Sequence, residues 1–162
     1  MFSKSRFVLF LVLAMVLLLT ACAGPFGKNA VTQNVTDPTI SVPMNFVEAR
    51  RTGPVYDVSV TVPGDWVNQF SVRNVGNMVQ FLYNDNGRER FVFSIEALSD
   101  KQYWQASGSY PASQVNIINL GDTYFVYHLP IDTFYSGLPA EQFQAFAAAV
   151  PDIVASFTAA AQ

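Results

Sequence analysis

A run of thirteen apolar residues at the start of the chain, Phe7 to Leu19, most limits what this chain can fold into. A helix needs about 20 apolar residues to cross the hydrocarbon core of a membrane, so the run is too short for a comfortable permanent span. Lys4 and Arg6 precede it and supply the positive charge that a signal peptide carries on its cytoplasmic side. We therefore predict that residues 1–21 are an export signal.

The run ends in Leu19-Thr20-Ala21-Cys22, an aliphatic residue, two small residues and the only cysteine of the chain. This motif resembles the lipobox of bacterial lipoproteins, in which the cysteine carries diacylglycerol as a thioether and becomes the mature N-terminus. The resemblance implies that Cys22 is lipidated and that the protein is anchored to the outer face of the plasma membrane or to the outer membrane. An incidental cysteine after an ordinary signal peptide is the alternative.

Removal of residues 1–21 leaves 141 residues, which suits one domain, with seven basic and twelve acidic side chains and a net charge of −5. Nucleic-acid binding relies on Lys and Arg to neutralise phosphates, so we expect no nucleic-acid partner. A lipidated Cys22 leaves no thiol for an internal disulfide. The stability of the domain must then come from packing.

Residues 22–45 are rich in Gly, Pro, Asn and Thr and show neither a helical nor a strand period. Such a composition is typical of a flexible linker. We therefore predict that residues 22–45 are the lipidated N-terminus and a flexible tether, and that one α+β domain spans residues 46–162.

Several stretches of this domain alternate apolar and polar residues, as half-buried strands do. The predicted strands are 56–62, 70–72, 78–83, 91–97, 115–120 and 123–129. Turn residues at 84–87 and at Gly121-Asp122 predict two hairpins. Trp66, after the turn Pro63-Gly64-Asp65, is expected to close one end of the core.

Two helices are expected. Ser99 can cap a short helix over residues 100–106, followed by a loop at 107–113. Pro139 suits a first helical position, and an apolar stripe with spacings of three and four runs from Phe143 to Phe157. Pro151 interrupts this stripe and predicts a kink or a break into two helices. The order of elements indicates an α+β fold with a central antiparallel sheet flanked by helices.

Four of these features together resemble the PsbP and Mog1-like α/β/α sandwich proteins. They are Val-Thr-Val-Pro-Gly-Asp-Trp at 60–66, the aromatic hairpin 79–95, the strand 124–129 and the terminal helix ending in Ile153-Val-Ala-Ser-Phe157. The resemblance implies a sheet flanked by helices that serves mostly for protein docking. The chain lacks the cluster of His and carboxylates that would suggest a metal, so no functional residue is transferred, and function does not follow from fold.

Groups suited to catalysis are few. His128, the only histidine, lies in a predicted strand, where a structural role is favoured over a catalytic one. The acidic residues around the first hairpin are interpreted as solvated charges; they are Asp85, Glu89, Glu96 and Asp100. We find no nucleotide-binding, metal-binding or nucleophile motif, and we expect no cofactor.

Tyr103, Trp104 and Tyr110 form the most suggestive stretch, because aromatic side chains with polar groups are favoured in recognition surfaces. A core position is nevertheless the favoured interpretation for Trp104. We predict a noncatalytic docking or scaffold domain that binds a protein partner through the sheet edge or through the loop at 103–111. The alternative is capture of a small ligand or carbohydrate beneath this loop, and an enzyme ranks third.

Overall fold

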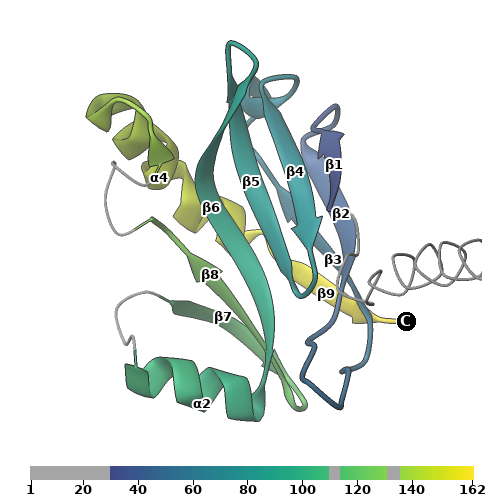
Figure 1. Ribbon diagram of the computed structural model, residues 1–162. Helices are drawn as coiled ribbons and strands as arrows, with labels where there is room; N and C mark the ends of the chain where they lie inside the picture. The colour runs from purple at the N-terminus through teal and green to yellow at the C-terminus, as the bar shows by residue number, and fades with distance from the viewer. Residues whose placement is uncertain (1–29, 110–113, 131–135) are drawn as a thin grey trace, which may run out of the picture.

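The alternating stretches form two antiparallel sheets in the computed structural model, which describes residues 30–109, 114–130 and 136–162 (Figure 1). The larger sheet has the order β1–β4–β5–β6–β8–β7 and the smaller has the order β2–β3–β9. The strands of the larger sheet are β1 (Val31–Asn34), β4 (Phe70–Val75), β5 (Met78–Asp85), β6 (Arg88–Ser99), β7 (Val115–Leu120) and β8 (Thr123–His128). Those of the smaller sheet are β2 (Thr39–Met44), β3 (Tyr56–Thr61) and β9 (Thr158–Ala161).

Both predicted hairpins are confirmed. Strands β5 and β6 pair from Asp85↔Arg88 onward, and Asn86 and Gly87 between them have positive φ angles of 53° and 83°. A two-residue turn with positive φ at both positions twists in the same sense as the strands it joins. Strands β7 and β8 pair across Gly121-Asp122, where Gly121 has a φ angle of 64°.

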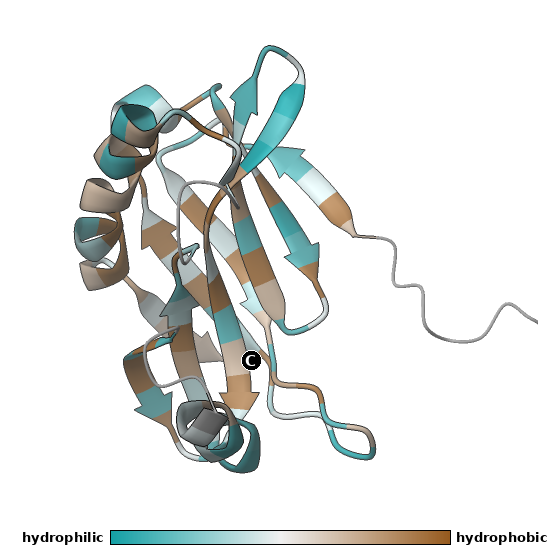
Figure 2. Ribbon diagram, turned by 60° about the vertical axis from the view of Figure 1, so that its left-hand side comes forward, coloured by the Kyte–Doolittle hydropathy of each residue, from teal (hydrophilic) through white to brown (hydrophobic). Residues whose placement is uncertain are grey.

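The core lies between the larger sheet and a layer made of the smaller sheet and the helix α4 (Ala140–Ala155). Phe81 and Phe93 stack with ring centroids 4.1 Å apart, and Tyr56 of β3 meets Phe125 of β8 edge to face. Figure 2 shows the hydrophobic and hydrophilic residues alternating along the strands, as this one-sided burial requires.

Trp66 closes one end of this core, as predicted. It follows a single 3-10 turn at Gly64–Trp66 and is buried, with its ring stacked 4.0 Å from that of Phe70. Phe146 of α4 meets both rings edge to face. The aromatic contacts join the helix to the sheet.

The broad prediction of one α+β domain built on an antiparallel sheet is confirmed, with α4 on one face and α2 (Asp100–Ser109) packed against the other face. The second sheet was not predicted. It lies behind the larger sheet in Figure 1 and covers much of the face that the sequence pattern assigned to helices.

The predicted tether boundary at residue 45 is wrong, because β1 and β2 lie within residues 31–44. Ile40, Val42 and Met44 of β2 alternate with exposed residues and are buried against the larger sheet. Pro43 made this segment resemble a linker, but β2 is an edge strand, where proline is tolerated. The predicted signal peptide and Cys22 lie outside the described residues.

Of the kink or break predicted at Pro151, the break into two helices is wrong, since α4 is one helix with Pro151 inside it. Val150 and Ile153, on either side of the proline, are buried in the core and hold the helix against the strands. Within the three described ranges, no helix combines the length and the apolar character that crossing a membrane requires.

Replacement of Met44, which is only 2% exposed, tests whether β2 belongs to the domain. We expect Met44→Ala to lower the free energy of unfolding by about 2–5 kcal/mol, because it leaves a cavity in a packed core. Gln33→Ala, at an exposed position of β1, is the control and should change it by less than about 0.5 kcal/mol. Urea unfolding of the purified chain, followed by tryptophan fluorescence, measures the free energy of unfolding of both variants. Equal unfolding midpoints for the two variants would contradict the assignment of β2 to the domain.

Candidate functional site

Helix α2 begins with a reciprocal cap that fixes where its aromatic residues point. The backbone N–H of Gln102 donates to the Ser99 hydroxyl at 3.1 Å, and the backbone N–H of Ser99 donates to Oε1 of Gln102 at 2.9 Å. The Ser99 hydroxyl also donates to the Glu48 carboxylate. This is a capping box, and it confirms the predicted cap, although the helix continues to Ser109 instead of ending near 106.

The structure brings Tyr103 and Trp104 together but places them differently. Tyr103 is partly buried and stacks on Tyr124 of β8, with centroids 4.2 Å apart and planes 13° apart. Trp104 is 62% exposed, and its indole N–H donates to the Asp100 carboxylate at 3.1 Å. The favoured core position for Trp104 is therefore wrong, because neighbouring residues of a helix point about 100° apart and Tyr103 faces the sheet. Tyr110 lies outside the described residues.

Tyr124 lies beneath this helix in a setting that keeps its hydroxyl neutral. Partial burial raises the pKa of Tyr124, and the negative charge of Asp100 raises it further. The same carboxylate therefore accepts from Trp104 and opposes ionisation of the tyrosine. The aromatic side chains of α2 and β8 thus share one acidic partner.

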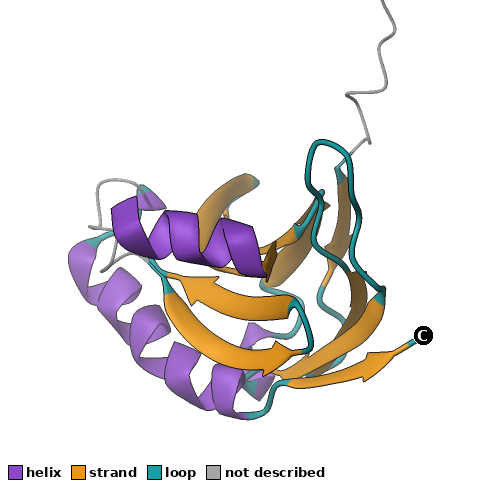
Figure 3. Ribbon diagram, turned by 90° about the horizontal axis from the view of Figure 1, so that it is seen from below, coloured by secondary structure: helices purple, strands orange, loops and turns teal. Residues whose placement is uncertain are grey.

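Strand β7 is the second part of this region, and sequence reasoning identified it as a strand but not as a surface. It lies at the edge of the larger sheet and, among the described strands, pairs with β8 alone. Val115 and Ile118 are 48% and 40% exposed. Gln114, just before the strand, ties it to α2 by donating to the Ser107 hydroxyl at 2.8 Å. Figure 3 shows α2 alongside β7 and β8.

We call Trp104 together with strand β7 the α2–β7 edge. It combines a large exposed aromatic ring with exposed aliphatic side chains on an edge strand. The signal in the sequence was the strand itself, Val-Asn-Ile-Ile-Asn-Leu, which contains no charged residue. Natural edge strands are commonly protected by charge, by proline or by a β-bulge. Strand β7 has neither charge nor proline, and it has a bulge between Asn116 and Ile118.

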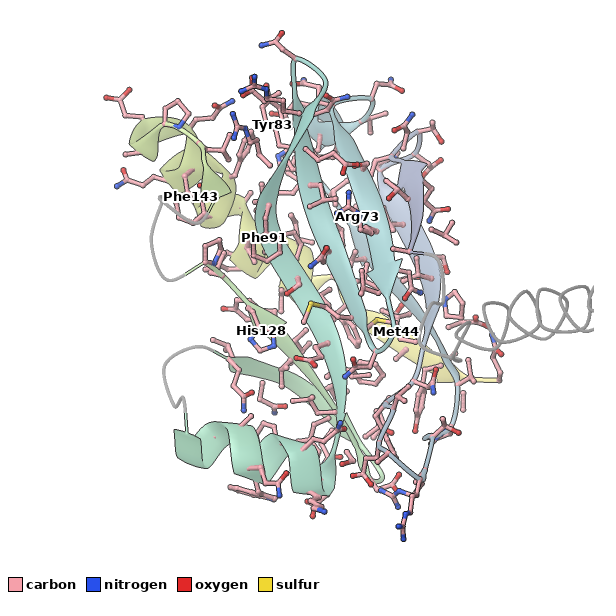
Figure 4. All side chains as sticks on the ribbon, in the orientation of Figure 1. Met44, Arg73, Tyr83, Phe91, His128 and Phe143 are labelled. Carbon is pink, nitrogen blue, oxygen red and sulfur yellow. The ribbon has the colours of Figure 1, made fainter. Side chains whose placement is uncertain are left out.

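His128 has a carboxylate partner within the sheet. Its Nε2 lies 2.9 Å from Oε2 of Glu96 on the neighbouring strand, and both side chains are about one-fifth exposed. Asn77 donates to the other oxygen of Glu96 at 3.0 Å. A histidine held this way by its neighbours in a sheet fits the structural role predicted for it, and Figure 4 shows it on β8.

Two of the predicted solvated acids also have partners. Glu89 pairs with Arg73 across the larger sheet, and Asp85 lies 3.3 Å from Nε of Arg90 across the hairpin turn. Both pairs are partly exposed. The pair Asp85–Arg90 joins the two strands of the β5–β6 hairpin, whereas Arg73–Glu89 joins β4 to β6 over the intervening strand β5. Partly exposed ion pairs such as these add modestly to stability.

A groove of about 540 Å³ lies elsewhere, between the outer strands of the two sheets. Val31 of β1, Pro43 of β2 and Val55 supply apolar lining, and Asn45 and Asn74 supply amides. A hollow that does touch α2 is lined by polar and charged residues such as Arg50, Lys101 and Gln105. Neither of these two hollows includes Tyr103 or Trp104 in its lining.

Across residues 30–109, 114–130 and 136–162, no three His, Cys, Asp or Glu side chains are grouped as a metal site would need. Comparison of the chain with protein-family models, with curated proteins and with solved structures finds no match. The geometry alone therefore indicates the candidate site, which is the α2–β7 edge.

The pairing of Asp100 with the aromatic residues can be tested by titration. We expect Tyr124 to titrate above the ordinary value of 10.0, and Asp100→Asn to lower its pKa, because removal of a negative charge favours the phenolate. Carbon-13 NMR of labelled tyrosine rings measures the titration. Asp152→Asn, an exposed carboxylate on α4, should leave it unchanged; a similar shift in both variants would rule out the contact as its cause.

Proposed function

We propose that this protein is a membrane-anchored extracytoplasmic lipoprotein whose domain is a noncatalytic docking or scaffold module for a protein partner. The anchor would be lipid on Cys22, and the docking surface would be the α2–β7 edge. The observation that carries the docking proposal is the exposed Trp104 on α2, together with the uncharged edge strand β7, which pairs on one side with β8 and is tied to α2 through Gln114.

The anchor is supported by the order of charge, apolar run and lipobox at residues 4–22. Each buried methylene contributes roughly 0.8 kcal/mol to membrane binding, so the two or three acyl chains of a lipoprotein suffice for stable attachment where one does not. Strand β1 begins at Val31, nine residues after Cys22. A short connection of this kind would keep the domain close to the bilayer.

Docking is supported by the unfavourable free energy of leaving the apolar side chains of the α2–β7 edge in contact with water. A few side chains near the centre of an interface supply much of its binding energy, and Trp is among the residues most enriched there. The indole of Trp104 already has its N–H satisfied by Asp100, so a partner could cover the ring without leaving a buried polar group unpaired. The partnered His128 and Glu96 are consistent with a noncatalytic domain.

The finer fold assignment belongs to the same proposal. We infer a relationship to the PsbP and Mog1-like proteins from the order of the strand before Trp66, the aromatic hairpin, the strand β8 and the terminal helix α4.

Capture of a small ligand or carbohydrate is the second candidate function. The groove beside β1 and β2, with its apolar lining and two amides, favours it.

Lipidation is tested by growing cells that produce the full chain with a labelled fatty acid. The chain should incorporate the label, and Cys22→Ala should not, because no other cysteine is present to form the thioether. Ser71→Ala, far from the lipobox, serves as a control for expression and export. Equal label in the Cys22→Ala chain would refute the anchor.

Docking is tested by placing a photo-crosslinking amino acid at position 104 of the full chain in its native membranes. We expect irradiation to give a discrete protein adduct, identified by mass spectrometry, and expect Ile118→Lys in the same chain to reduce it several-fold. The matched control carries the crosslinker at Gln144, an exposed position on α4. No adduct at 104, or equal adducts at both positions, would count against a docking surface here.

A further inference from the structure

The sequence of β7 reads almost the same in both directions. From residue 115 it is Val-Asn-Ile-Ile-Asn-Leu, and reversed it is Leu-Asn-Ile-Ile-Asn-Val. When such a strand pairs antiparallel with a copy of itself, residues whose numbers sum to 235 lie opposite each other. Ile117 then meets Ile118 of the second copy, Asn116 meets its Asn119, and Val115 meets its Leu120.

The register of β7 on β8 sorts these side chains onto the two faces in the same symmetric way. Asn116 and Asn119 lie opposite Val126 and Tyr124, which share the face covered by α2. Val115 and Ile118 lie opposite Tyr127 and Phe125, which share the core face. Ile117 is the extra residue of a β-bulge, and it packs with Leu120 against the core.

The bulge therefore lies at the centre of the palindrome. It places both Asn residues on one face and the four aliphatic residues on the other. Without the bulge, two Asn residues three positions apart would lie on opposite faces of the strand. A second copy related by a two-fold axis through this centre would match Asn with Asn and aliphatic with aliphatic on each face. Side chains directly opposite each other across an antiparallel pair are the unit of sheet stabilisation.

The other edge strands of the two described sheets are less suited to such pairing. Strand β2 contains Pro43, whose backbone nitrogen cannot donate a hydrogen bond. Strands β1 and β9 are only four residues long. Strand β7 has six residues with neither charge nor proline, and Asp122 in the turn beside it is paired with Arg51 at 3.2 Å.

We propose that β7 is a dimerisation strand, which pairs antiparallel with β7 of a second copy of this chain and joins the two larger sheets into one. This inference rests on the docking surface proposed above and names its partner. The interface is isologous, so each edge is used once and the assembly closes as a dimer. Pairing would cover the exposed parts of Val115 and Ile118.

Cysteine crosslinking tests the register directly. Two differently tagged full-length chains, one with Asn116→Cys and one with Asn119→Cys, are produced together in membranes and mildly oxidised. Opposite residues of an antiparallel pair have Cα atoms about 4.5–5.5 Å apart, within the range that a disulfide bridges. We expect a disulfide-linked dimer that contains both tags and forms at least tenfold more than any single-variant dimer.

Each variant alone is the matched control. Two copies of residue 116 would lie three positions apart, about 10 Å along the strand, which is too far for a disulfide. Gln33→Cys on the opposite edge β1 measures random collision, and wild-type chain measures any contribution of Cys22. Ile118→Lys added to the pair should abolish the crosslink, because it places two lysines against the isoleucines at the centre of the interface.

Absence of the mixed dimer, or equal crosslinking by Asn116→Cys alone, would overturn the proposed pairing. If photo-crosslinking at position 104 then still captured a different protein, the docking surface would stand and only its partner would be wrong. If neither the mixed disulfide dimer nor an adduct at position 104 formed, both the dimer and the docking function would be refuted. The two proposals are thus separated by their readouts.

Discussion

Burial of one face of the six-stranded sheet is the interaction on which the rest of this structure depends. Phe81, Phe93 and Phe125 line that face and are fully buried. The chain has no disulfide in its described part, so this apolar packing, worth roughly 25 cal/mol per Å² of buried surface, must offset the entropy of ordering the chain. The smaller sheet and α4 exist as ordered elements because each contributes apolar side chains to this face.

The same packing determines what remains exposed. Because the smaller sheet and α4 occupy the inner face, α2 packs on the opposite face at the end next to β7, held by the stack of Tyr103 on Tyr124. The turn of the helix then directs Trp104 outward. Strand β7 is the last strand of the sheet and has no further strand to pair with in the described domain. The docking and dimerisation proposals both follow from this arrangement at one end of the sheet.

Local patterns predicted the elements well where one rule decided the outcome. The positive-φ residues Asn86 and Gly87 mark the first hairpin, and Ser99 marks the start of α2, because turn and cap chemistry act over a few residues. The failures had tertiary causes. The linker-like segment around Pro43 becomes a strand because β3 pairs with it, and α4 continues through Pro151 because its neighbours are buried.

The sequence by itself determined the strand periods, both hairpins and the two helices, since these depend on residues close together in the chain. The proposal of export and lipid attachment also rests on the sequence alone. Only the tertiary structure decided that a second sheet covers the core, that Trp104 is exposed and that β7 is an edge. The physical reason is that exposure and strand order depend on which distant segments pack together. The near-palindrome of β7 is a property of the sequence, but it acquires meaning only because β7 is the edge strand of the described sheet, with β8 on one side alone.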